Sequence, residues 1–161
     1  MGGPRLTASL ALLMAAIALP QQGIAQKVRV TDLSDVNFGL VSNLQADARR
    51  SQNICLFSNS TGGRYSITAT GSGSASSFAL NDGTHSLPYD VEWSDQSGQT
   101  SGSNLSPAVT ATGRVSAASQ QSCNSGPASS ASLIVVLRAS SLTQAREGNY
   151  SGSLTLLVAA E

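Results

Sequence analysis

The strongest pattern in the sequence is an alternation of apolar and polar side chains between residues 150 and 159. On an extended chain, one face would carry Tyr150, Leu154, Leu156 and Val158, and the other would carry serine and threonine side chains. Successive side chains of a β-strand point to opposite faces of its sheet, so this pattern predicts a strand that is buried on one face only. Because a lone strand is unstable, the rest of the chain has to supply further strands.

Shorter segments of the same kind, separated by runs of Gly, Ser and Asn, occur along the rest of the chain. They are residues 28–31, 36–41, 51–58, 64–70, 78–80, 85–87, 89–93 and 109–115, together with a continuous apolar run at 133–137. The turn-forming runs 59–63 and 81–83 each lie between two of these segments and predict a hairpin at each place. One helical turn is expected within residues 141–146. These short strands predict an all-β fold, an antiparallel immunoglobulin-like sandwich.

The composition agrees with this fold class and excludes one class of function. The chain has 161 residues, the length of one ordinary domain. Charged residues make up 11% of it, against about 25% in typical soluble domains, and nine basic residues balance nine acidic ones. No basic stretch is longer than Arg49-Arg50, so a nucleic-acid-binding role is not expected.

The N-terminus predicts an export signal. An uncharged apolar run at residues 6–19 follows a positively charged start, and small residues precede a cleavage position between Ala25 and Gln26. The run is too short for a membrane-spanning helix, which needs about 20 residues. We therefore expect residues 1–25 to be a signal peptide and residues 26–161 to be an exported domain without a membrane span.

The two cysteines, Cys55 and Cys123, both lie in the expected mature chain. In an oxidising compartment outside the cytosol, an even pair of cysteines is most simply a disulfide. Together with the only histidine, His85, they supply too few ligands for a four-coordinate zinc site. We expect a disulfide between them, no metal site and no cofactor.

The expected last strand raises the question of how the sandwich closes. The strand ends close to Glu161, with no further strand behind it to pair with its second edge, so the sandwich is expected to be incomplete. A strand supplied by another protein would cover that edge, a mode of recognition known as β-augmentation. Alternatively, residues 27–32 would pair with the last strand and complete a monomeric, secreted binding domain. The residues alone leave both arrangements open.

Four motifs of the sequence form a recognisable set. They are Val-Asn-Phe-Gly at 36–39, Asn-Ile-Cys at 53–55 before Arg-Tyr-Ser-Ile at 64–67, Leu-Pro-Tyr-Asp-Val-Glu-Trp at 87–93 and Gly-Asn-Tyr-Ser-Gly-Ser-Leu-Thr-Leu at 148–156. Together they resemble the spore coat protein U domain, a family that includes subunits of archaic chaperone-usher pili in Gram-negative bacteria. The resemblance spans residues 28–160. It implies an incomplete sandwich that lacks its last strand, which a periplasmic chaperone and then a neighbouring subunit complete.

Carried over to this sequence, the resemblance implies a groove that accepts the incoming strand. The groove would be lined by Val36 and Phe38 of the early segment and by Tyr150, Leu154, Leu156 and Val158 of the last strand. The implied partners are a periplasmic pilus chaperone, an outer-membrane usher and neighbouring subunits, on a route from the periplasm to the cell surface. Residues 26–33 must serve either as a donor strand or as the domain's own first strand. This suits a subunit that accepts a strand but donates poorly, for example at a pilus tip.

The side chains that could carry catalysis are better explained as structural. His85 lies in a predicted turn beside Asp82, and no nucleophile motif accompanies it. Asp90 and Glu92 share one face of a predicted strand and are expected to be solvated, not to form a glycosidase pair. Trp93 shares its face with apolar residues and is expected in the core, not stacked on a sugar. We therefore do not expect an enzyme.

Overall fold

The computed structural model describes residues 25–124 and 126–161. Most of the predicted signal peptide, residues 1–24, lies outside the described residues, and the expected cleavage between Ala25 and Gln26 stays a prediction. No helix in the described ranges is long and apolar enough to cross a membrane.

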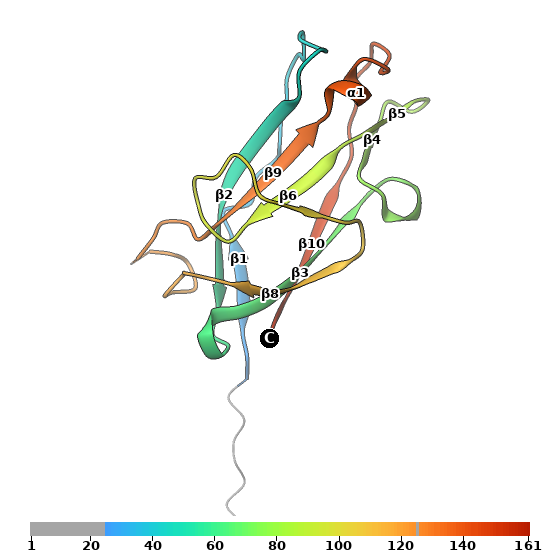
Figure 1. Ribbon diagram of the computed structural model, residues 1–161. Coiled ribbons are helices and arrows are strands. Elements are labelled where there is room, and N and C mark those ends of the chain that lie inside the picture. Colours follow the sequence, from blue (N-terminus) through green and yellow to red (C-terminus); the bar gives the residue numbers. More distant parts are fainter. Residues whose placement is uncertain (1–24, 125) are drawn as a thin grey trace, which may run out of the picture.

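The regular secondary structure of the described residues is almost entirely β-strand, and the strands pair in antiparallel fashion (Figure 1). The strands are β1 (Val28–Thr31), β2 (Ala48–Ser58), β3 (Arg64–Gly71), β4 (Ala79–Asn81), β5 (Ser86–Pro88), β6 (Asp90–Ser94), β7 (Ser103–Leu105), β8 (Thr110–Val115), β9 (Ala131–Leu137) and β10 (Leu154–Ala160). One helical turn, α1 (Ala139–Leu142), follows β9, and short 3-10 turns lie at Thr61–Gly63 and Ser74–Ser76. The predicted all-β class is confirmed.

Two sheets form the sandwich. One has five strands in the order β1-β2-β9-β6-β7, and the other has three in the order β10-β3-β8. A separate hairpin joins β4 to β5. β1 and β10 are therefore edge strands of different sheets, and they lie beside each other without pairing.

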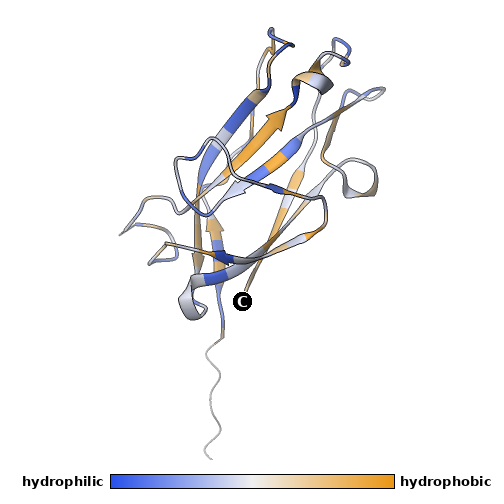
Figure 2. Ribbon diagram, in the orientation of Figure 1, coloured by the Kyte–Doolittle hydropathy of each residue, from blue (hydrophilic) through white to orange (hydrophobic). Residues whose placement is uncertain are grey.

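The core lies between the two sheets, and β9 is its most buried strand. All seven residues of β9 are buried, which confirms the strand predicted from the continuous apolar run. Figure 2, coloured by hydropathy, shows the hydrophobic character of this strand. Leu133 and Val135 face the core shared with the other sheet, and Trp93 of the neighbouring β6 is fully buried there, as predicted. Ile134 is fully buried too, which the alternation places on the opposite face of β9. A loop after β6 lies over that face, where Gln99 N–H donates to Ser132 Oγ at 3.1 Å.

The predicted hairpin between residues 51–58 and 64–70 is wrong. β2 belongs to the five-stranded sheet and β3 to the three-stranded sheet, so the turn between them crosses from one layer to the other. Both strands send alternate side chains into the same core from opposite sides. The turn is held by the hydroxyls of Ser58 and Ser60, which both donate to the carbonyl oxygen of Arg64.

Residues 36–41, expected to be a strand, are not one. The chain leaves β1 at Asp32, whose positive φ of 66° turns it away from the edge of β2. Side chains of β2, and not its backbone, hold the segment that follows. A strand needs a ladder of backbone hydrogen bonds, and no other strand among the described residues supplies one to this segment.

The sequence predicts that the carboxylates of Asp90 and Glu92, both on β6, are solvated. This prediction is wrong for Glu92, whose side chain is buried, since the residue is only 4% exposed. Arg49 Nη1 donates to both of its carboxylate oxygens at 3.1 Å, and the backbone N–H of Gly102 donates to Oε2 at 3.0 Å. Arg138 donates through Nε to Asp90 Oδ2 at 2.6 Å. Two arginines distant in sequence, together with the loop after β6, therefore bury a group that the alternation places on the outer face.

The predicted disulfide between Cys55 and Cys123 is confirmed, with an S–S distance of 2.01 Å. It joins β2 to the long connection between β8 and β9. Cys55 is fully buried in a small cluster with Ala118 and Phe57, separate from the main core. The bond therefore holds this connection against β2.

The second predicted hairpin, β4 with β5, is confirmed. Its turn is closed by Asp82, whose Oδ1 accepts hydrogen bonds from the backbone N–H groups of Thr84 and His85. His85 Nδ1 lies 3.0 Å from Asp82 Oδ2. These hydrogen bonds lower the pKa of Asp82 from 3.8 to about 2.

This shift predicts a loss of stability in acid. Because the folded pKa lies below the ordinary value, ionised Asp82 stabilises the fold above about pH 4, and that stabilisation is lost as the pH falls towards 2. Asp82→Ala should therefore lower the thermal midpoint near neutral pH, and its difference from the unsubstituted protein should shrink as the pH falls from about 4 through about 2. Circular dichroism melts across this range measure the difference. Asp35→Ala, at an exposed position outside the hairpin, is the control, and a difference for Asp82→Ala that stayed constant with pH would contradict the prediction.

Candidate functional site

The site that the sequence predicts centres on the free edge of β10. β10 pairs with β3, and no strand among the described residues pairs with its second edge. The backbones of Ser153 and Glu161 are hydrogen-bonded towards the β3 side. Hydrogen bonds alternate along an antiparallel ladder, so Leu154, Leu156 and Val158 direct their N–H and C=O groups towards the free edge.

The apolar face of β10 is only partly covered. Leu154, Leu156 and Val158 pack against the core but remain half-buried, whereas every residue of β9 is buried. Leu157, on the opposite face of β10, is 68% exposed. The core-facing side chains and the edge-facing backbone groups of β10 are therefore both incompletely covered.

The N-terminal segment brings a second group of apolar side chains to the same core. Val36 and Phe38 are half-buried and pack against the cluster that β10 also contacts. The structure thus brings onto one core all six residues that the resemblance assigns to a groove: Val36, Phe38, Tyr150, Leu154, Leu156 and Val158. We refer to these six residues, with the free edge of β10, as the open seam. Their role in accepting a strand stays a prediction.

The alternative closure by the N-terminal strand is not present. β1 pairs with β2, from Val28 opposite Ser58 to Thr31 opposite Cys55. It lies beside β10 but shares no ladder with it. The strand expected within residues 27–32 thus belongs to the five-stranded sheet, and it leaves the edge of β10 unpaired.

On the opposite side of the sandwich, the two sheets are linked to each other by a chain connection and by side-chain contacts, whereas at the open seam they are not. There, residues 106–109 connect β7 directly to β8 and so join the two sheets. Arg114 of β8 donates to Ser103 Oγ of β7 at 2.9 Å and lies 3.8 Å from Asp95. Between β1 and β10, no hydrogen bond or ion pair links the residues that the structure describes.

The β4–β5 hairpin fixes the segment before β10. The backbone N–H and C=O groups of Ser151 exchange hydrogen bonds with those of Asn81, at 3.0 and 2.8 Å. A Cβ atom at Gly152 would lie 3.0 Å from the carbonyl oxygen of Ala79, so a larger residue would force the two segments apart. The Tyr150 hydroxyl donates to a backbone carbonyl four residues earlier. The motif before β10 therefore sets where the strand begins.

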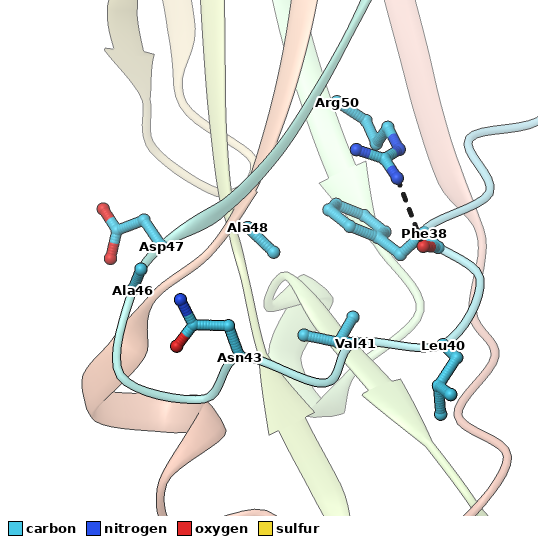
Figure 3. Close-up of a pocket in the computed structure, with 8 residues that line it drawn as sticks. All are labelled: Phe38, Leu40, Val41, Asn43, Ala46, Asp47, Ala48 and Arg50. Carbon is cyan, nitrogen blue, oxygen red and sulfur yellow. Dashed lines mark hydrogen bonds between the residues drawn. The ribbon is translucent and has the colours of Figure 1, made fainter.

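A hollow of about 200 Å³ lies next to the open seam, where the N-terminal segment turns into β2 (Figure 3). Its lining residues are Phe38, Leu40, Val41, Asn43, Ala46, Asp47, Ala48 and Arg50. Asp47 is already engaged, because the backbone N–H of Ala139 and the guanidinium of Arg138 both donate to its carboxylate. These hydrogen bonds hold the pKa of Asp47 below its usual range.

Two residues that the sequence analysis did not single out hold the N-terminal part of the open seam. Gln52 Oε1 accepts from the backbone N–H and the hydroxyl of Ser34, both at 2.9 Å, and Gln52 Nε2 donates to Ser34 O at 3.1 Å. Arg50 donates to Asn37 O at 3.2 Å and to Phe38 O at 3.3 Å, the latter bond visible in Figure 3. The sequence contains one signal that could have identified them. Arg50 and Gln52 are long polar side chains on a face of β2 that is buried farther along the strand.

The side chains considered for catalysis lie apart from the hollow and from the open seam. His85 is in the exposed β4–β5 turn, and its ring contacts Asp82. Asp90 and Glu92 project from β6 and are bound by Arg138 and Arg49. None of these four acidic and imidazole groups lines the hollow.

Comparisons with known proteins give no family assignment. No family model matches the chain, and no curated protein matches it. The resemblance to the spore coat protein U domain therefore rests on the sequence motifs alone.

Two solved structures are weakly similar to this chain. One belongs to a chaperone–tip adhesin complex of CFA/I fimbriae biogenesis; it is 13% identical, with a TM-score of 0.48 over 84% of this chain and 41% of that chain. The other is from the CsuC–CsuE chaperone–tip adhesion subunit pre-assembly complex of archaic chaperone-usher Csu pili of Acinetobacter baumannii; it is 18% identical, with a TM-score of 0.42 over 84% of this chain and 40% of that chain. This chain thus spans about two fifths of either one.

Proposed function

We propose that this chain is an exported structural or adhesive subunit of a pilus or surface fibre, assembled by accepting a β-strand from another protein. One observation carries the proposal: the edge of β10 is open and its sequence does nothing to protect it. Soluble proteins guard open edges with charged side chains, proline or a bulge. β10 contains no charged residue and no proline, and its register with β3 runs without a shift.

The side chains along this edge suit an apolar strand as the partner. The half-buried Leu154, Leu156 and Val158 leave apolar surface that alternate side chains of an added strand would cover. In β-augmentation, the backbone ladder supplies affinity, and alternate side chains supply specificity. The partner is therefore an extended segment with apolar residues at every second position.

The motif resemblance supports a more specific set of partners. It adds a periplasmic pilus chaperone, an outer-membrane usher and neighbouring subunits, in a role that is structural and not enzymatic. The predicted signal peptide and the disulfide fit a protein that is exported to the periplasm and the cell surface. β1 is already paired with β2, and donating it would break that ladder. This supports a position, such as a pilus tip, from which no strand has to be donated.

An appended strand tests the acceptor function. A segment of alternating valine and threonine, as long as β10, is joined to Glu161 through a glycine-containing turn. If it pairs with β10, the free energy of unfolding of the oxidised chain should rise by about 2 kcal/mol, which raises Tm by roughly 6 °C. The control extension carries serine in place of each valine and so cannot cover the apolar side chains. Equal Tm values for the two extended chains would overturn the proposal.

The same chains test the class of partner when they are co-exported with a periplasmic pilus chaperone. The unextended chain should associate through its open edge when alone and form a one-to-one complex with the chaperone, as measured by size-exclusion chromatography with light scattering. The valine-containing extension should abolish both, because its edge is already occupied. An unextended chain that remains monomeric and ignores the chaperone would instead be a self-complete secreted domain.

A further inference from the structure

The outer faces of the two sheets differ in charge and in covering. On the five-stranded sheet, Arg49 and Arg138 form ion pairs with Glu92, and the loop after β6 lies over the same face. On the three-stranded sheet, alternation places eight uncharged side chains on the outer face, and none of them is buried. We call this group the hydroxyl face: Ser66, Thr68, Thr70, Thr110, Thr112, Thr155, Leu157 and Ala159.

The hydroxyl face is continuous across its three strands. The hydroxyls of Thr68 and Thr110 lie 2.8 Å apart in a hydrogen bond, so β3 and β8 present these side chains to the same side. In the ladder with β10, Thr68 stands opposite Leu157, and Thr70 stands opposite Thr155. The largely exposed Leu157 therefore lies among short hydroxyl side chains in the middle of the face.

The chemistry of the hydroxyl face limits what can bind to it. Soluble proteins usually intersperse charged side chains over such a surface. Without charge, this face offers nothing to a nucleic acid or to an anionic membrane, and without an aromatic ring it offers no stacking surface to a sugar. A second hydroxyl face matches it, because no charged group has to lose its water when the two meet.

Charged side chains stand at one end of the hydroxyl face only. There, the backbone N–H of Glu161 donates to Arg64 O at 3.2 Å, and the backbone N–H of Gly113 donates to the Glu161 carboxylate at 2.8 Å. At the other end, the backbone N–H of Ser72 donates to Ser153 O at 3.0 Å. The face thus has a charged end, with Arg64 and Glu161, and a neutral end, with Ser72 and Ser153.

This distribution of charge selects one way for two copies to meet face to face. The two ends lie equally far from the middle, because Arg64 and Ser72 are each four residues from Thr68. A two-fold axis that crosses the strands at Thr68 therefore brings the charged end of each copy over the neutral end of the other. An axis that follows β3 would instead place Arg64 over Arg64, which like-charge repulsion disfavours.

We infer that the hydroxyl face binds the hydroxyl face of a second copy of this chain, across a two-fold axis that crosses the strands at Thr68 and Leu157. Leu157 of one copy then meets Leu157 of the other, with the two sheets about 10 Å apart. The inference goes beyond the proposed function, because it uses the outer face of the sheet and needs no strand to be accepted at the open seam.

The size of the face makes this a weak contact between two isolated chains. Three strands about 4.8 Å apart, each contributing nine residues at about 3.4 Å, cover about 400 Å² per copy. Stable interfaces bury at least about 1,200 Å² in total, which two such faces do not reach. Copies arrayed along a fibre would present many such faces at once, and the weak contacts would then hold neighbouring fibres side by side.

Cross-linking between single cysteines on β3 tests the contact and its register. β3 lies inside its sheet, so association through the edge of β10 cannot bring two copies of β3 together. With the native disulfide intact, a short bismaleimide at a chain concentration of about 1 mM should link Thr68→Cys to itself. Thr70→Cys alone should link about tenfold less, because the axis places it opposite Ser66 of the other copy. A mixture of Thr70→Cys and Ser66→Cys should link as well as Thr68→Cys.

A charge at the centre of the face supplies the matched comparison. Leu157→Lys places two like charges opposite each other and should lower the yield of linked Thr68→Cys about tenfold. Leu40→Lys adds the same charge at another exposed leucine, outside the hydroxyl face, and should leave the yield unchanged. Both leucines are largely exposed, so neither substitution should lower Tm.

The possible results separate this inference from the proposed function. Equal linking of Thr68→Cys and Thr70→Cys would indicate random collisions, and no linking of either would show that the faces do not meet; both results overturn the inference. The same pattern is expected in the chain with the appended valine–threonine strand, whose open edge is occupied. Loss of the pattern in that chain would assign the contact to the edge of β10, which refutes the inference and leaves the proposed function standing.

Discussion

Opening the disulfide between Cys55 and Cys123 is expected to lower the free energy of unfolding by about 4 kcal/mol. The bond spans a sequence separation of 68 residues, and closing so long a loop restricts the unfolded chain strongly. In the folded state, the bond holds the connection before β9 against β2, so its loss also frees a long polar segment. Urea unfolding of the oxidised and the reduced protein, followed by circular dichroism, measures the difference.

The reduced protein is a better comparison than a substituted one, because it keeps every side chain. Cys55 is fully buried, so Cys55→Ala would add the cost of a small cavity to the effect of opening the loop. The double substitution of both cysteines by alanine should therefore be at least as destabilising as reduction. A difference between oxidised and reduced protein below about 1 kcal/mol would show that the loop does not limit the unfolded chain.

Trp93→Ala is expected to cost about 4 kcal/mol, an effect of similar size. Trp93 is fully buried in the middle of the sandwich, and its ring meets the edge of Tyr65 from the other sheet at 6.5 Å between centroids. Its Nε1–H donates to Tyr65 Oη at 2.8 Å and to Asp95 Oδ1 at 3.0 Å. Alanine would leave a large cavity and remove a shared donor between the two layers.

Trp93→Phe separates these two contributions. It keeps an aromatic ring but loses the indole donor, and should cost about 2 kcal/mol. Burial raises the pKa of the Tyr65 hydroxyl above its usual range, so this group stays protonated and continues to donate to Asp95 in the variant. Chemical denaturation followed by circular dichroism is the appropriate measurement, since Trp93 is the only tryptophan in the chain. Equal losses for Trp93→Ala and Trp93→Phe would mean that ring packing contributes little.

Patterns confined to a few neighbouring residues predicted much of the fold. The apolar run at 133–137 is the buried centre of the larger sheet, Trp93 lies on the core face of its strand, and the Asp-Gly turn after β4 closes a hairpin. Each of these depends on the local pattern of apolar residues or on turn chemistry, which act over short distances along the chain. The single pair of cysteines predicted the disulfide for a different reason, because no other partner exists for either one.

Features that depend on distant segments could not be predicted in this way. Residues 51–58 and 64–70 are strands, as predicted, but alternation does not reveal that they belong to opposite sheets. Glu92 is buried because Arg49 of β2 and Arg138, which follows β9, both reach it. The family resemblance predicted the apolar residues of the candidate site. It did not predict the side chains of β2 that hold the N-terminal ones in place, which only the structure shows.

The open seam also determines how this protein would respond to mechanical load. β1 begins and β10 finishes at the same end of the sandwich (Figure 1). A tension between these two points would pull across the ladders and peel them open one hydrogen bond at a time. A tension that enters through a strand lying along β10 would run parallel to the ladder, so that its hydrogen bonds would share the force and break together. The protein would therefore resist pulling better with a strand in the open seam than as an isolated chain.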